Sequence, residues 1–159
     1  MEKISRSIRI HAPVAQVFEH LSKPENLLEI WPSMIEVKNE VVQASGAHAF
    51  DWTYKMAGVR FHGHCETVEV EPNRLRVDHN ESGIPSTFRW RFAGADGTTE
   101  VQLEIEYEPP FVLGLVAAPF LRRLNEHEAE TLLANLKARM EAKPEETAGA
   151  PERVAPPAP

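Results

Sequence analysis

Cysteine is nearly absent from the chain: Cys65 is the only one among 159 residues. The sequence therefore excludes an internal disulfide and any Cys-x-x-Cys metal or redox site, and we interpret Cys65 as a small apolar core residue. Basic residues are also in deficit, since 17 Lys and Arg stand against 24 Asp and Glu for a formal net charge of −7. This balance argues against a nucleic-acid partner, because a phosphate backbone attracts positive charge.

Long apolar runs are missing as well. The longest spans residues 111–121, is interrupted by Gly114 and Pro119, and has about half of the roughly 20 residues that a membrane-spanning helix needs. We therefore predict no integral membrane segment. The first residues contain no basic region followed by an apolar one, so we predict no cleaved secretory signal and expect a cytoplasmic protein.

The common catalytic and cofactor motifs are absent too. There is no GxGxxG, GxxxxGK[ST], HExxH or GxSxG sequence, and we predict no cofactor and no metal. His62 and His64 lie two residues apart on a predicted strand and so share a face, but no third ligand stands at a suitable spacing. Which face they occupy stays open, because the apolar alternation changes phase and predicts a bulge between Cys65 and Val68.

Apolar periodicity predicts one α+β domain over residues 1–143. The remaining residues, 144–159, are mostly Pro, Ala, Glu and Gly. Such a segment buries too little apolar surface to offset its ordering entropy, so we predict a disordered tail.

The predicted elements begin with a strand over residues 3–10, where isoleucines alternate with polar residues. A short helix follows Pro13, and a second helical turn is expected after a capping box formed by Ser22 and Glu25. From 34 to 108, turn signals separate six more strands, which predicts an antiparallel sheet covered on one side. Strong helix formers then predict a long C-terminal helix that covers the sheet.

This order of elements resembles the START-related SRPBCC superfamily, which includes the polyketide cyclase/dehydrase-like proteins. The sequence carries the resemblance in Ile10-His11-Ala12-Pro13-Val14, in Val17-Phe18 and in Trp31-Pro32. The resemblance implies a helix-grip fold over about residues 2–142. In that fold a curved seven-stranded sheet wraps the long helix and leaves an apolar cavity between them.

Polar residues on otherwise apolar faces are the candidate functional groups. Asn125 and Glu128 fall on the apolar arc of the C-terminal helix, where an unpartnered polar group is costly unless it faces a wet cavity. His79 shares a face with Leu75 and Val77, so we expect it to point inward. We predict that Glu128 and His79 interact as candidate catalytic groups. The candidate ligand-binding residues are Trp52, Tyr54, Trp90, Tyr107, Asn125, Phe111 and Phe120.

Three functions stay open. The first is binding or carriage of a small hydrophobic molecule that is lipid-like, polyketide-like or aromatic. The second is a cofactor-independent cyclase/dehydrase of the aromatase type, in which Glu128 and His79 would move protons. The third is a protein-interaction or chaperone-activator module. Arg122 and Arg123 beside the apolar segment could support transient membrane contact, and the sequence does not indicate an oligomeric state.

Overall fold

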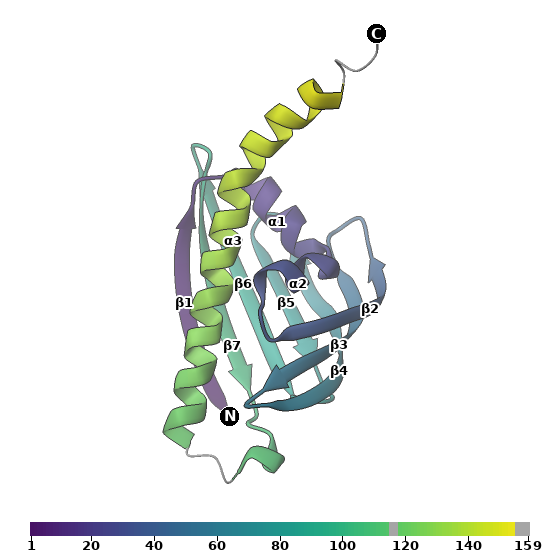
Figure 1. Cartoon of the computed structure of the whole chain (residues 1–159), viewed down its shortest axis with the longest axis vertical. Coiled ribbons are helices and arrows are strands. Elements are labelled where there is room, and N and C mark those ends of the chain that lie inside the picture. Colours follow the sequence, from purple (N-terminus) through teal and green to yellow (C-terminus); the bar gives the residue numbers. More distant parts are fainter. Residues whose placement is uncertain (115–117, 155–159) are drawn as a thin grey trace.

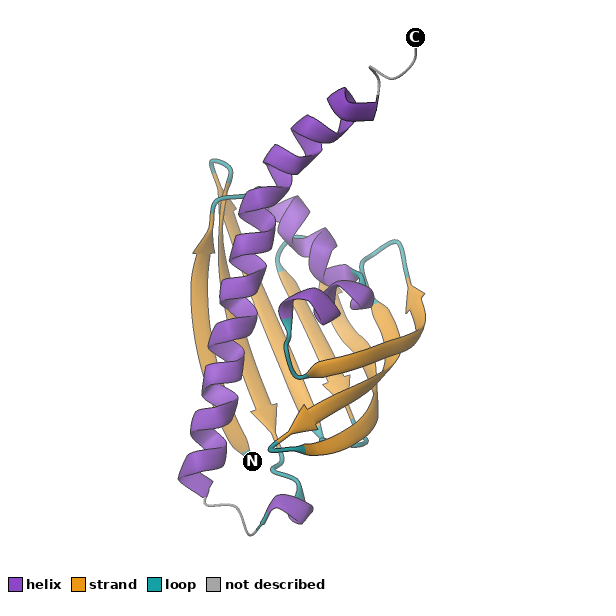
Figure 2. Ribbon diagram, viewed as in Figure 1, coloured by secondary structure: helices purple, strands orange, loops and turns teal. Residues whose placement is uncertain are grey.

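The computed structural model describes the backbone of residues 1–114 and 118–154 and the side chains of residues 1–114 and 118–142. One curved sheet and a long helix dominate the structure (Figures 1 and 2). In chain order, the elements are β1 (Glu2–Ile10), α1 (Val14–Ser22), η1 (Pro24–Asn26), α2 (Leu27–Ile30), β2 (Met34–Val42), β3 (His48–Met56), β4 (Val59–Glu71), β5 (Leu75–Asn80), β6 (Ser86–Ala95), β7 (Thr98–Tyr107), η2 (Phe111–Leu113) and α3 (Ala118–Val154).

The sheet has seven strands in the order β1-β7-β6-β5-β4-β3-β2, and every neighbouring pair is antiparallel. Figure 1 shows α3 crossing one face of the sheet, with α1 and α2 beside it. The predicted α+β helix-grip architecture is therefore confirmed. No helix among the described residues is long and apolar enough to cross a bilayer.

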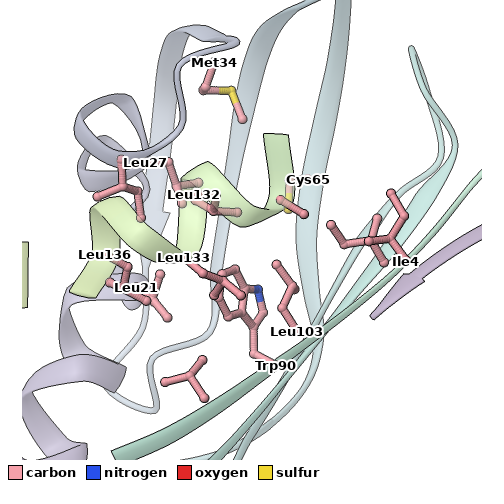
Figure 3. Packing of buried hydrophobic residues seen from close by; sticks show 14 of the residues in the cluster. Ile4, Leu21, Leu27, Met34, Cys65, Trp90, Leu103, Leu132, Leu133 and Leu136 are labelled. Atoms are coloured by element: carbon pink, nitrogen blue, oxygen red, sulfur yellow. The ribbon is translucent and has the colours of Figure 1, made fainter. Parts of the chain in front are cut away.

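The core forms where the apolar faces of the strands meet the apolar arc of α3. Alternate residues of β3, β6 and β7 are buried, as the period of a half-buried strand predicts. From α3, Leu132, Leu136 and Met140 are fully excluded from solvent. Figure 3 shows Leu132 and Leu136 packed in the same layer as Trp90 and Leu103 of the sheet.

Two details of the predicted elements need correction or comment. The expected capping box does not form, because Ser22 is the last residue of α1 and its hydroxyl donates to the carbonyl of Phe18 at 2.8 Å. The backbone of α3 continues to Val154, past the predicted domain end near Lys143. The contribution of residues 144–159 to stability stays a prediction.

The bulge predicted in β4 lies close to the expected place. The register with β5 shifts between Thr67 and Glu69, which leaves Val68 as the extra residue. N-terminal to the bulge, Cys65 points into the core while His62 and His64 are exposed. The two histidines therefore occupy the outer face of the sheet.

Candidate functional site

A cavity of about 90 Å³ lies between the sheet and α3. Its wall is mostly apolar, and the Phe, Trp and Tyr members are Trp31, Phe50, Trp52, Tyr54, Phe88, Trp90 and Tyr107. Ala129 and Leu132 of α3 face them from the helix side. An apolar wall with a few polar groups is typical of small-molecule sites. The volume equals that of about three water molecules in the liquid, so a larger ligand must displace side chains or extend beyond the cavity.

A second hollow, of about 440 Å³ and open to solvent, adjoins the cavity. Tyr54, Met56, Asn125 and Glu128 line both spaces. We call this hollow the mouth, because it adjoins the cavity on its solvent side; it lies between α3, the loop before β2 and the turn that joins β3 to β4. A molecule seated in the cavity can continue into this mouth.

The polar groups at the mouth are held by hydrogen bonds. The Asn125 amide donates to the Tyr107 hydroxyl at 2.8 Å, and Glu128 accepts a bond of 2.8 Å from the backbone N–H of Ser33. The Tyr54 hydroxyl accepts a bond of 3.2 Å from the Trp31 indole. Burial raises the pKa of both tyrosines, so their hydroxyls stay protonated and can donate near neutral pH.

The deep end of the cavity contains a polar network that the sequence did not indicate. Arg76 is fully buried and donates to both carboxylate oxygens of Asp78, at 3.3 and 3.1 Å. The Asp78 carboxylate also accepts from the Thr67 hydroxyl at 2.7 Å and lies 3.5 Å from Nε2 of His48. Burial lowers the pKa of His48, which favours the neutral imidazole.

A second chain of hydrogen bonds runs beside this network. The Trp52 indole donates to Asn80 at 2.8 Å, and the Asn80 amide donates to the Ser86 hydroxyl at 3.1 Å. Gly63 makes room for the indole, because a Cβ at this position would lie 2.2 Å from Cζ2 of Trp52. The backbone of β4 thus sets the orientation of Trp52 in the cavity wall.

The predicted pair of Glu128 and His79 does not form. His79 lies on the outer face of β5, where its imidazole is 41% exposed and its Nδ1 is 3.2 Å from the Thr87 hydroxyl. Alternation in β5 has the opposite phase to the one predicted: Arg76, Asp78 and Asn80 point inward. These polar side chains can be buried because they have hydrogen-bond and ion-pair partners in the core. The positions of apolar residues along the strand cannot reveal such partners.

The other predicted residues divide into two groups. The structure places Trp52, Tyr54, Trp90, Tyr107, Asn125 and Glu128 on the cavity wall. By contrast, Phe111 is 100% exposed and Phe120 is 60% exposed, and neither lines the cavity. Their apolar character predicted burial against a ligand, but their elements, η2 and the start of α3, lie beyond the end of the sheet (Figure 1).

One buried set of side chains has the chemistry of metal ligands. His48, Cys65 and Asp78 each offer an atom, and these atoms lie within 4.8 Å of one another. Arg76, however, already neutralises Asp78, and burial raises the pKa of the Cys65 thiol well above its usual range. A divalent cation would therefore meet a guanidinium and a protonated thiol, so this arrangement fits a cation poorly.

Residues 1–141 match the family model described as "Polyketide cyclase / dehydrase and lipid transport". Among curated protein sequences, none matches the chain.

Solved structures with this fold come from several bacteria. The protein TTHA0849 from Thermus thermophilus has a TM-score of 0.76 and 18% identity, with 89% of this chain and 99% of that chain covered. The Zhui aromatase/cyclase from a Streptomyces species has a TM-score of 0.72 and 16% identity, with 89% and 94% covered. A START superfamily protein from Mycobacterium smegmatis has a TM-score of 0.70 and 15% identity, with 87% and 97% covered. At these identities the similarity shows the fold alone.

Proposed function

The chain belongs to the polyketide cyclase/dehydrase and lipid transport family, and from this premise we propose that it binds a small hydrophobic molecule in the cavity between the sheet and α3. The observation that carries the proposal is the wall of aromatic and aliphatic side chains that continues into an open mouth. A ligand that fills such a space removes its apolar surface from water. This burial contributes a favourable free energy of about 25 cal/mol per Å² of apolar surface. No covalent step is required for this function.

Two measurements test the proposal. Native mass spectrometry of protein purified from its host should show a retained hydrophobic molecule. Naphthalene, a purely apolar probe, should bind saturably and change the fluorescence of the cavity residues Trp52 and Trp90.

Matched variants on α3 make the binding test specific. Ala129 is buried and lines the cavity, so Ala129→Leu should fill the space and weaken naphthalene binding at least tenfold. Ala134 is exposed on the same helix, and Ala134→Leu should bind like the wild type. Wild-type protein that binds no apolar probe and retains no ligand would reject the proposal and favour a protein-interaction role.

A cofactor-independent cyclase/dehydrase is the second candidate. It is supported by the polar groups that line the cavity, namely the Glu128 carboxylate, the Asn125 amide and the hydroxyls of Tyr54 and Tyr107. A carboxylate can act as a general base while tyrosine hydroxyls orient carbonyl oxygens. In this mechanism His79 takes no part, because it lies on the outer face of the sheet.

Glu128→Gln separates the two functions, because glutamine keeps the shape but removes the charge. If the protein only binds, affinity should change by about 1 to 3 kcal/mol at most, the range for one buried polar contact. If Glu128 is a catalytic base, conversion of a poly-β-keto mimic should fall by about 10² to 10⁴ while binding persists. Absence of any conversion by the wild type would reject the enzymatic function.

A further inference from the structure

The deep end of the cavity presents hydrogen-bond acceptors to whatever occupies it. Nδ1 of His48 lies 2.9 Å from the carbonyl oxygen of Ser22. Because a carbonyl can only accept, the proton of the neutral imidazole is on Nδ1. Nε2 is then an acceptor, and it faces Oδ1 of Asp78 at 3.5 Å. Two acceptors at this distance repel each other unless a donor lies close to both.

Arg76 does not serve as that donor. Nε donates to the Asp78 carboxylate, and Nη1 donates to the Ser22 hydroxyl at 3.1 Å. Nη2 lies 3.3 Å from Nδ1 of His48, but its two hydrogens go to the Gly46 carbonyl at 2.6 Å and the Thr67 hydroxyl at 3.1 Å, so Nδ1 keeps its own proton for Ser22. Arg76 is completely buried and is not part of the cavity wall, whereas His48 and Asp78 both line it. The guanidinium therefore stabilises the Asp78 carboxylate from the side away from the cavity. The atoms of the cluster that face the cavity are hydrogen-bond acceptors of His48 and Asp78.

The charge of the cluster decides which kind of donor fits. Arg76 and Asp78 form an ion pair with no net charge, and burial lowers the pKa of His48, which favours its uncharged form. A cation at this site would add an uncompensated buried charge, and a carboxylate would face the oxygens of Asp78. A neutral O–H or N–H group can donate to Asp78 or His48 without either cost.

We propose that His48 and Asp78 bind the hydroxyl or N–H group of an otherwise apolar, uncharged ligand at the deep end of the cavity. This inference rests on the proposed function and narrows its ligand class to alcohols, phenols and N–H heteroaromatic compounds. The ligand enters with its donor group first. Its apolar remainder then lies among the aromatic side chains and extends toward the mouth.

A series of naphthalene derivatives tests the inference on the wild-type protein. 2-Naphthol carries the donor, 2-methoxynaphthalene lacks it, and 2-naphthoate carries a negative charge in the same position. We expect 2-naphthol to bind about tenfold more tightly than 2-methoxynaphthalene, as one well-formed buried hydrogen bond predicts. We expect 2-naphthoate to bind at least tenfold more weakly than naphthalene.

The same series separates this inference from the proposed function. If naphthalene binds but 2-naphthol binds no better than its methyl ether, the inference is overturned and the proposed function stands. If 2-naphthoate is the tightest ligand, the deep end is not acceptor-rich and the inference also fails. If no member of the series binds, the proposed function fails and this inference fails with it.

Two variants assign the effect to the cluster. The ring centroids of His48 and Phe50 lie 5.3 Å apart. His48→Phe therefore keeps an aromatic ring beside Phe50 but removes the acceptor Nε2. We expect the preference for 2-naphthol over its methyl ether to fall to about threefold or less, with naphthalene affinity retained. His64→Phe makes the same change on the outer face of the sheet and should keep the full preference. Stoichiometric Zn²⁺ binding that Cys65→Ala abolishes would instead identify a metal site and overturn the proposal.

Discussion

At the scale of single residues, Arg76 carries a positive charge that is shielded completely from solvent. It is fully buried in the ion pair with Asp78, and hydrogen bonds to Ser22, Gly46 and Thr67 satisfy its other nitrogens. A buried ion pair adds little net stability compared with apolar side chains of the same volume. Removal of one partner is costly, because the other charge stays buried without compensation.

Arg76→Met should therefore lower the free energy of unfolding by about 3 to 5 kcal/mol, which urea denaturation can measure. Arg74→Met is the matched control, two residues earlier in the chain. Arg74 is 75% exposed and pairs with Glu71, which is also on the surface, so this change should cost less than about 1 kcal/mol. Equal effects of the two substitutions would contradict the buried ion pair.

His48 and His64 should titrate on opposite sides of the ordinary histidine pKa of about 6.5. Burial lowers the pKa of His48. A hydrogen bond of 2.7 Å to Asp51 raises the pKa of His64, which also lies 3.2 Å from Glu66. NMR titration of the imidazole protons should give the two midpoints in this order. Coincident midpoints would contradict the environments that the structure assigns to them.

The two shifts have opposite effects on stability. The raised pKa of His64 gives stability that is present below about pH 6.5 and is lost as pH rises through the raised value. The lowered pKa of His48 means that the unfolded chain binds the proton more readily, so its effect is a loss of stability as pH falls below about 6.5. In His48→Phe, the stability profile should lose the acidic decrease. His64→Gln should leave that decrease intact.

At the scale of elements, predictability depends on whether a strand buries only apolar side chains. The inner faces of β3, β6 and β7 follow from alternation, since residues such as Trp52, Trp90 and Leu103 alternate with polar neighbours and are buried. In β5 the inner face is Arg76, Asp78 and Asn80, whose partners lie on α1, β3, β4 and β6. Such partners are distant in sequence. Apolar periodicity therefore predicted the wrong inner face for β5, and with it an inward orientation of His79.

Two glycines in the sheet should differ in their tolerance of alanine. A Cβ at Gly63 would lie 2.2 Å from the Trp52 ring and 2.6 Å from the carbonyl oxygen of Ser82, and the backbone cannot move aside easily. A Cβ at Gly94 would lie 2.8 Å from Val14, at the start of α1, and a small shift of the helix relieves that contact. We expect Gly63→Ala to cost about 3 kcal/mol and Gly94→Ala about 1 kcal/mol, the two ends of the range for overpacking.

Urea denaturation of the two glycine variants gives the comparison, and the Trp52 indole resonance reports on the cavity wall. Gly63→Ala should shift that resonance because the ring can no longer hold its bond to Asn80. Gly94→Ala should leave it in place. A Gly63→Ala variant as stable as the wild type would mean that the close approach of Trp52 to β4 is absent in solution.

At the scale of the whole molecule, the order of elements predicts the architecture but not the size of the cavity. The strand, two short helices, six strands and final helix have few ways to form one antiparallel sheet with a covered face. The volume of about 90 Å³ depends instead on how side chains such as Trp31, Trp52 and Leu132 pack, which no periodicity encodes. The fold was therefore predictable from sequence, whereas the cavity volume and the deep polar cluster depend on contacts between residues far apart in the chain.

The last prediction concerns how much of the C-terminal helix the domain needs. Residues 144–159 contain a single branched aliphatic residue, Val154, so their composition offers little apolar surface to bury. Their deletion should leave the melting temperature unchanged.

Truncation after Ala134 is the informative comparison, because it also removes Leu136 and Met140, which are both fully buried against the sheet. Loss of each large apolar side chain costs about 2 to 5 kcal/mol of stability. The two losses together are comparable to the whole free energy of unfolding of a typical domain. We therefore expect the shorter truncation to melt like the full chain and the longer one not to fold. A decrease of several degrees on deletion of 144–159 would show that this segment docks on the domain, and would place the domain end beyond Lys143.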